Sequence, residues 1–196
     1  MASGNEQLPD LVELLATDLN GYFSQLMLSY QQRLYAFALR QSGSPQDAED
    51  IVQEAFIRAY HALADYPQER IRTMKLQPWL YKITLHVFYR QKGNARLQYA
   101  PLDLSEESMH LEIEDDERVQ PEHLLEEKEA LCELEALISQ LPEQYRIAVS
   151  CYYFDELSYR EIADLLNLPI GTIKSQVHRG TLLLRRTVEK RSRTTM

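Results

Sequence analysis

The sequence has few cysteines and few glycines. Only two of its 196 residues are cysteine, Cys132 and Cys151, and they form no C-x-x-C pair. A disulfide framework or a structural zinc site is therefore not expected, and both residues are predicted to be small apolar core side chains. Six glycines and eight prolines exclude a collagen-like or low-complexity chain.

Long apolar runs are also missing. No run approaches the roughly 18 residues that a membrane span needs, and the first residues, MASGNEQLPDLVELL, contain neither a basic leader nor an apolar signal segment. These absences predict a cytoplasmic protein that does not insert into a membrane.

The sequence contains no recognisable catalytic motif. Its five histidines are scattered, and it has no glycine-rich phosphate loop and no nucleophile motif. We therefore expect a protein that is not an enzyme and that needs no cofactor and no metal ion.

Positive and negative charges are separated along the chain, whose formal net charge is −9. Residues 70–96 carry seven basic and no acidic side chains, and residues 170–196 carry seven basic and one acidic side chain. Residues 97–145 carry 15 acidic and two basic side chains. Because salt limits the reach of a charge to about 8–10 Å, the local sign matters more than the total. The sequence is compatible with a two-site polyanion binder, and the alternative is that the basic runs are merely solvated surfaces.

Apolar periodicity predicts helices throughout the first half of the chain. A helix is expected over residues 22–41 and another from about Pro78 to Arg90. Between them, Ser44 is a suitable N-cap for a helix that begins at Pro45. The predicted buried positions of that middle helix are spaced as on one helical face: Ala48, Ile51, Val52, Ala55, Phe56, Ala59 and Leu63.

An acidic, weakly periodic segment follows, with prolines near both ends, and we expect it to be an extended linker. Four helical segments are predicted after it, near residues 124–140, 143–154, 158–167 and 170–188. The predicted fold is all-α, with two small helical domains joined by an acidic linker. Its parts are an N-terminal extension (1–21), a first domain (22–97), the linker (98–123) and a second domain (124–196).

The second domain contains the pattern of a helix-turn-helix. Ser158 and Glu161 form the S-x-x-E capping box that opens a short helix, and that helix is expected to end near Asn167. Pro169 then suits the first turn of the next helix, because its missing N–H would be unpaired there. Two short helices around such a turn are typical of a DNA reader. The alternative is an ordinary two-helix hairpin with a basic surface.

Helical phase predicts which side chains of the last helix can reach DNA. Ile170, Ile173, Val177 and Leu184 are expected to face the core, and Gln176 lies nearer to that side. Ser175, His178 and Arg179 are the best candidates for contacts with base edges, and Arg185 and Arg186 for contacts with phosphates. The complete set of candidate DNA contacts on this helix is Gly171, Thr172, Lys174, Ser175, His178, Arg179, Arg185 and Arg186.

Three stretches in this order resemble bacterial sigma factors of the extracytoplasmic function (ECF) type: DAEDIVQEAFIRAY, PWLYKITLHVFYRQK and SYREIADLLNLPIGTIKSQVHRG. The resemblance implies that the first is a helix that binds the RNA polymerase core. It implies that the second melts the promoter and reads its −10 element, and that the third reads the −35 element.

The helix that resembles the core-binding helix combines acidic residues with an exposed apolar one, Ile57, a combination that suits a protein partner. The resemblance implies docking on the polymerase core, at the clamp helices of its largest subunit and at its flap. The candidate core-binding residues are Asp47, Asp50, Gln53, Glu54, Ile57 and Arg58.

The basic segment that resembles the −10 reader also contains aromatic residues, which can stack on unpaired bases. Trp79 shares a helix face with Ile83 and is expected in the core. By resemblance, the loop YPQERIRTMKLQ captures a flipped base of the −10 element. The candidate −10 contacts are Tyr66, Arg70, Arg72, Lys75, Lys82, Tyr89, Arg90 and Lys92.

The sequence therefore predicts an alternative sigma factor that directs the polymerase core to specific promoter DNA. The resemblance also implies an anti-sigma factor as a partner. By resemblance, the acidic linker occupies polymerase channels that normally hold nucleic acid, and the alternative is a simple spacer. Two other functions stay open at this point. One is a helix-turn-helix regulator that is not a polymerase subunit, and the other is a polymerase-binding inhibitor.

Overall fold

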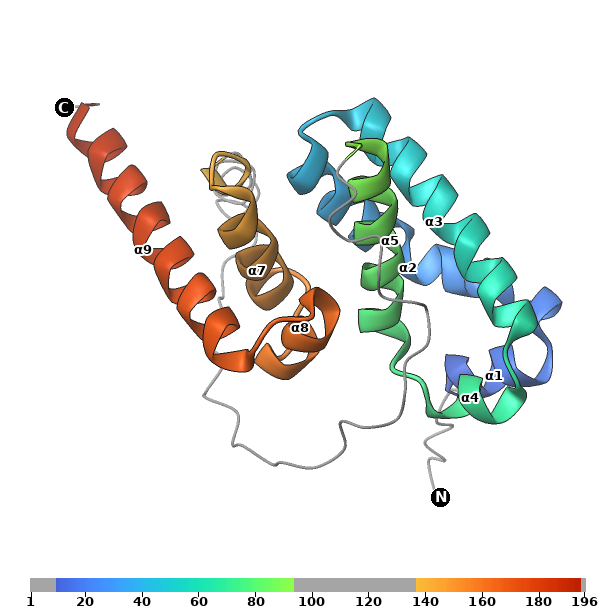
Figure 1. Ribbon diagram of the computed structural model, residues 1–196. Helices are drawn as coiled ribbons and strands as arrows, with labels where there is room; N and C mark the ends of the chain where they lie inside the picture. Colours follow the sequence, from blue (N-terminus) through green and yellow to red (C-terminus); the bar gives the residue numbers. More distant parts are fainter. Residues whose placement is uncertain (1–9, 94–136, 195–196) are drawn as a thin grey trace, which may run out of the picture.

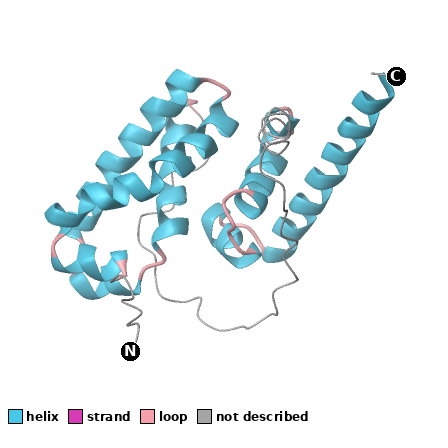
Figure 2. Ribbon diagram, turned by 180° about the vertical axis from the view of Figure 1, so that it is seen from behind, coloured by secondary structure: helices cyan, strands magenta, loops and turns pink. Residues whose placement is uncertain are grey.

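The computed structural model describes residues 10–93 and 137–194. Within these ranges every regular element is a helix and no strand occurs (Figures 1 and 2), which confirms the predicted all-α class. The acidic linker (98–123), most of the segment predicted as helix over 124–140, and Cys132 lie outside the described residues.

The helices form two groups along the chain (Figure 1). The first contains α1 (Leu11–Thr17), α2 (Leu19–Ser42), α3 (Pro45–Asp65), α4 (Gln68–Thr73) and α5 (Leu76–Gln91). The second contains α7 (Glu143–Tyr153), α8 (Tyr159–Leu166) and α9 (Ile170–Thr194).

Helix α3 begins and packs as its sequence predicts. The Ser44 side chain accepts a hydrogen bond from the Asp47 backbone N–H, and Pro45 occupies the first turn, where no intrahelical donor is lost. All seven positions predicted to be buried on this helix are buried. The opposite face is left to solvent and carries the candidate core-binding side chains.

Two short helices were not predicted from periodicity. Helix α1 lies in the N-terminal extension and is capped by the Asp10 side chain, and α4 lies in the loop between α3 and α5. The two pack against each other, and Arg72 of α4 is paired with Glu13 of α1 at 3.0 Å. Helices of seven and six residues are too short to show a helical repeat, and tertiary packing stabilises them instead.

The helix-turn-helix forms as expected. Both hydrogen bonds of the Ser158–Glu161 capping box are present, and Asn167 ends α8 in the left-handed region with φ 52°. Pro169 lies just before α9, and its carbonyl accepts from the N–H groups of Thr172 and Ile173.

The prediction was wrong for one of the four α9 residues expected in the core. Ile173, Val177 and Leu184 are buried as predicted, whereas Ile170 is 39% exposed. Ile170 is the first residue of α9, and it adjoins the exposed turn residues Leu168 and Pro169. Helical phase alone does not show where the covering helices stop.

The two groups of helices are in direct contact. Helix α5 packs against α8 and α2 packs against α7, and a single buried cluster includes apolar side chains from both groups, among them Phe37, Phe88, Ile147 and Ile162. Figure 1 shows α7, α8 and α9 together on one side of α2 and α5.

Candidate polymerase-binding and DNA-binding surfaces

An open groove runs between α3 and the end of α5, with a volume of about 490 Å³. Five of the six candidate core-binding residues line it; the sixth, Asp47, is exposed in the first turn of α3. Ile57 is 54% exposed within the groove, so an apolar side chain is accessible there among polar ones. The groove residues are Asp50, Gln53, Glu54, Ile57, Arg58, Val87, Arg90 and Gln91.

Charges of both signs meet in this groove. Arg58 pairs with Glu54 one helical turn away at 2.7 Å. His86 lies near Arg58 and Arg90, and burial together with these two cations lowers the pKa of its imidazole. Arg90, a candidate −10 contact, thus lines the groove together with the candidate core-binding residues. Asp50 and Gln53 are left as exposed polar groups around Ile57.

The candidate −10 contacts fall into separate places along α4 and α5. The Arg70 guanidinium lies 3.8 Å from the centre of the Tyr66 ring, in a cation–π contact at the end of α3. Arg72 is held by Glu13. Lys82, in the middle of α5, is half-buried.

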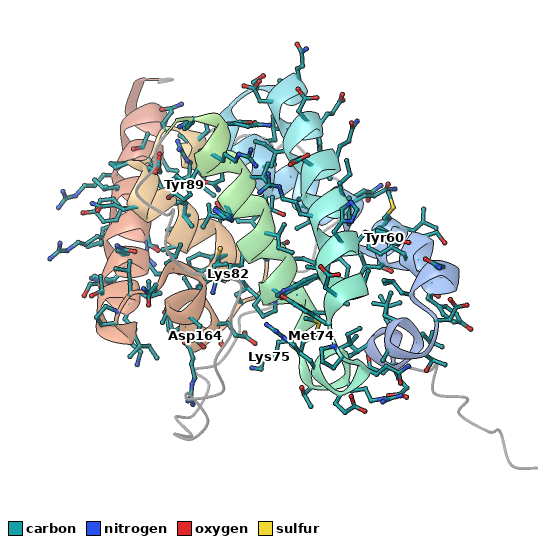
Figure 3. The ribbon with its side chains drawn as sticks, turned by 45° about the vertical axis from the view of Figure 1, so that its right-hand side comes forward. Tyr60, Met74, Lys75, Lys82, Tyr89 and Asp164 are labelled. Atoms are coloured by element: carbon teal, nitrogen blue, oxygen red, sulfur yellow. The ribbon has the colours of Figure 1, made fainter. Side chains whose placement is uncertain are left out.

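The other three candidates face the second group of helices. Lys75 pairs with Glu161 of α8 at 2.9 Å, and Lys92 pairs with Glu143 of α7 at 3.6 Å. Tyr89 also lies against Glu143, and burial together with that carboxylate raises the pKa of the Tyr89 hydroxyl. Figure 3 shows Tyr89 and Lys75 near opposite ends of α5.

All eight candidate −35 contacts are exposed on α9. Ser175 donates a hydrogen bond to the Gly171 carbonyl at 2.9 Å. The Lys174 ammonium lies 5.7 Å from the centre of the Tyr159 ring, which is stacked on Tyr152 with centroids 4.5 Å apart. The exposed face thus presents a cation supported by an aromatic pair.

Gly180 of α9 was not singled out in the sequence. A Cβ at this position would lie 2.5 Å from Val149 Cγ2 and 3.3 Å from Tyr145 Cβ of α7. The missing side chain lets α9 approach α7 closely and so fixes the angle at which the exposed face is presented.

Comparisons with known proteins agree with both halves of this arrangement. The family model described as "Sigma-70 region 2" matches residues 26–97, and the one described as "Sigma-70, region 4" matches residues 133–184. The "ECF RNA polymerase sigma factor SigW" of Bacillus subtilis (strain 168) is 33% identical over 168 residues, which cover 84% of this chain and 87% of the relative. This chain belongs to the ECF sigma factors. As an alternative sigma factor, it directs RNA polymerase to promoters, and the family is one of non-enzymatic initiation factors.

Two further similar proteins match most of this chain. The "ECF RNA polymerase sigma-E factor" of Escherichia coli (strain K12) is 32% identical over 181 residues, covering 90% of this chain and 92% of the relative. The solved structure of the sigma factor RpoE in complex with the anti-sigma factor NepR from Bartonella quintana superposes with a TM-score of 0.61 at 25% identity. It covers 85% of this chain and 96% of that one. No helix in the described ranges of this sigma factor is both long and apolar enough to cross a bilayer.

A buried polar network of this sigma factor was missed by sequence reasoning. Arg40 of α2 and Asp155, which follows α7, are 5% and 3% exposed and lie 3.1 Å apart. Tyr81 of α5 donates a hydrogen bond to Asp155 Oδ1 at 2.8 Å, and Gln77 donates to the Asp155 carbonyl. We call these four residues the Asp155 network. A signal existed for one of them, because Arg40 follows Phe37 by three residues and so continues the buried face of α2.

Proposed function

We propose that the two groups of helices divide the work of a sigma factor between them. The first domain (22–97) docks on the polymerase core and handles the −10 element, and the second (124–196) reads the −35 element. The linker (98–123) connects them, and the extension (1–21) supports α4 through α1. The observation that carries this proposal is the separation of two surfaces: a groove of mixed charge with an apolar centre between α3 and α5, and the exposed basic face of α9.

Core docking is assigned to the groove beside α3. Ile57 supplies an exposed apolar anchor, and Asp50, Gln53 and Glu54 surround it with polar and acidic groups. Such a surface of mixed charge suits a protein partner that carries charged and apolar groups, because interfaces commonly combine an apolar centre with a polar rim. Arg58 holds Glu54 in place by their ion pair.

Handling of the −10 element is assigned to α4, α5 and the turn between them. The basic residues there can hold the DNA backbone, and Tyr66 and Tyr89 can stack on separated bases. The −35 element is assigned to the outward face of α9. In this assignment Ser175, His178 and Arg179 contact base edges, and Arg185 and Arg186 contact phosphates.

The site of action follows from the partner. A polymerase subunit works where polymerase and chromosome are, so we propose a cytoplasmic location. The similar RpoE structure is a complex with an anti-sigma factor, and we propose that a protein of that class also controls this chain.

Reconstitution tests the proposed function. The purified chain is added to core polymerase on a library of genomic fragments, and run-off transcripts are sequenced. Discrete new start sites that require both components are expected. The chain alone and the core alone are the controls. A chain that binds DNA tightly but starts no transcript would be a regulator, and one that binds the core but starts no transcript would be an inhibitor. Either result contradicts the proposal.

A further inference from the structure

Arg72 of α4 is surrounded by polar side chains of its own protein. Its Nε lies 3.1 Å from Oε1 and 3.0 Å from Oε2 of Glu13, on α1. Its terminal nitrogens lie 3.4 Å from the side-chain oxygen of Gln68 and 4.0 Å from Glu69 Oε1, both on α4. One guanidinium thus faces two carboxylates. Because the three charged groups together are negative, contact of this guanidinium with a DNA phosphate is disfavoured.

Arg70 lies on another side of the same helix. Side chains two positions apart on a helix point in roughly opposite directions, about 200° apart. The Arg70 guanidinium lies over the Tyr66 ring, 3.8 Å from its centre, whereas Arg72 is directed at α1. Ile71, between the two arginines, is 4% exposed. Helix α4 therefore has one side that contacts α1 and another that holds two −10 candidates together.

Helix α4 depends on α1 for support. It has six residues and no side-chain N-cap, and a helix this short is not stable alone. Helix α1 packs against both α4 and α2, and Figure 1 shows α1 and α4 side by side. Leu15 and Ala16 of α1 are 1% and 5% exposed, and the Asp10 side chain caps the helix. Glu13 thus links an anchored helix to Arg72 of α4.

We propose that Glu13 and Arg72 are a positioning pair for recognition of the −10 element, and that Arg72 does not contact DNA. The inference rests on the proposed assignment of this element to α4 and α5. The pair holds α4 against α1, and α4 holds Arg70 over Tyr66, so that these two side chains meet the DNA in one arrangement. Such preorganisation lowers the cost of ordering them on binding. Discrimination between −10 sequences therefore depends on a residue of α1 that touches no DNA.

A direct phosphate contact by Arg72 would give the opposite result for one substitution. Glu13 would then compete with the phosphate for Arg72, and Glu13→Gln would strengthen binding to every sequence. If Glu13 positions α4, the same substitution weakens recognition of the preferred −10 sequence. Arg72→Gln also separates the two roles. Loss of a phosphate contact weakens binding to all sequences alike, whereas loss of positioning reduces the preference among −10 sequences.

The first measurement is the −10 preference of the reconstituted holoenzyme. Run-off transcription is compared between a selected promoter and versions with single-base changes in the −10 element. Glu13→Gln and Arg72→Gln should each lower the preference about three- to tenfold, and the double variant no further, because both remove one shared interaction. The preference among −35 sequences should not change. Glu69→Gln removes the other carboxylate near Arg72, whose side chain is 83% exposed, and as the matched control it should keep the −10 preference.

The second measurement is hydrogen–deuterium exchange of the free full-length chain. In Glu13→Gln the amides of α4 should exchange at least about threefold faster, because local opening of α4 costs less free energy, while those of α9 stay unchanged. The proposal is overturned if α4 exchange is unchanged in Glu13→Gln, if the −10 preference survives that substitution, or if Arg72→Gln weakens all promoters equally. Exchange needs no polymerase. A wild-type chain that starts no transcript would contradict the proposed function and leave the exchange result intact.

Discussion

Arg40 and Asp155 form a buried ion pair across 115 positions of the sequence. The pair lies where α2, α5 and the end of α7 meet, inside the cluster of apolar side chains that both halves share. Its partners Tyr81 and Gln77 satisfy further polar atoms of Asp155. A polar network in this position favours one specific packing of the two halves over other apolar contacts.

Gly180→Ala should destabilise the packing of α9 on α7. The new Cβ would overlap Val149 Cγ2 at 2.5 Å, and overpacking of this kind costs about 1–3 kcal/mol. Gly171→Ala is the control, because it makes the same substitution on α9 where nothing lies within 4 Å of the added Cβ. Urea unfolding should show Gly180→Ala to be less stable than Gly171→Ala by about 1–3 kcal/mol. Equal free energies of unfolding for the two variants would contradict this prediction, because they would mean that α7 shifts to accommodate the new Cβ with no loss of stability.

Glu54→Lys should weaken binding to core polymerase about tenfold or more. The change reverses a charge of the α3 groove and breaks the ion pair with Arg58. Glu49→Lys makes the same change of charge at an exposed position of α3 outside the groove, and should bind nearly as well as wild type. Affinity for core can be measured by biolayer interferometry. Equal losses in the two variants would point to net charge rather than to the groove.

Arg179→Ala should weaken initiation that depends on the −35 element by about 1–3 kcal/mol, as expected when a base contact is lost. The loss should fall on particular −35 sequences. Arg186→Ala provides the contrast, because removal of a phosphate contact weakens binding to all sequences alike and lowers the salt dependence. Run-off transcription from a set of −35 variants distinguishes the two. A uniform loss for Arg179→Ala would remove it from the base-reading face.

Much of the fold could be predicted from local signals. The Ser44 cap and the apolar spacing of α3 placed all of its buried residues, and the capping box with Asn167 placed the turn before α9. Helices α1 and α4 could not be predicted, because they are too short to carry a repeat and depend on contact with each other.

The candidate site was predictable to the extent that it follows helix phase. Exposure of Ile57 and of the α9 residues follows from spacing alone. The partners of Lys75, Tyr89 and Lys92 could not be found in this way, since Glu143 and Glu161 lie more than fifty residues further along the chain. Asp155 carries no local sign of burial, because its cost is offset by Arg40 and Tyr81, which come from two other helices. Contacts between distant charges depend on tertiary packing.

Footprinting on a selected promoter tests most directly the claim that one chain reads two elements. Hydroxyl-radical cleavage of DNA bound by core polymerase plus the chain should show protection at two segments about 25 base pairs apart, which is about 85 Å along B-form DNA. Permanganate should detect unpaired thymines in the downstream segment, and Arg179→Ala should reduce protection only in the upstream one. Protection of a single segment, or DNA that stays fully paired, would contradict the account.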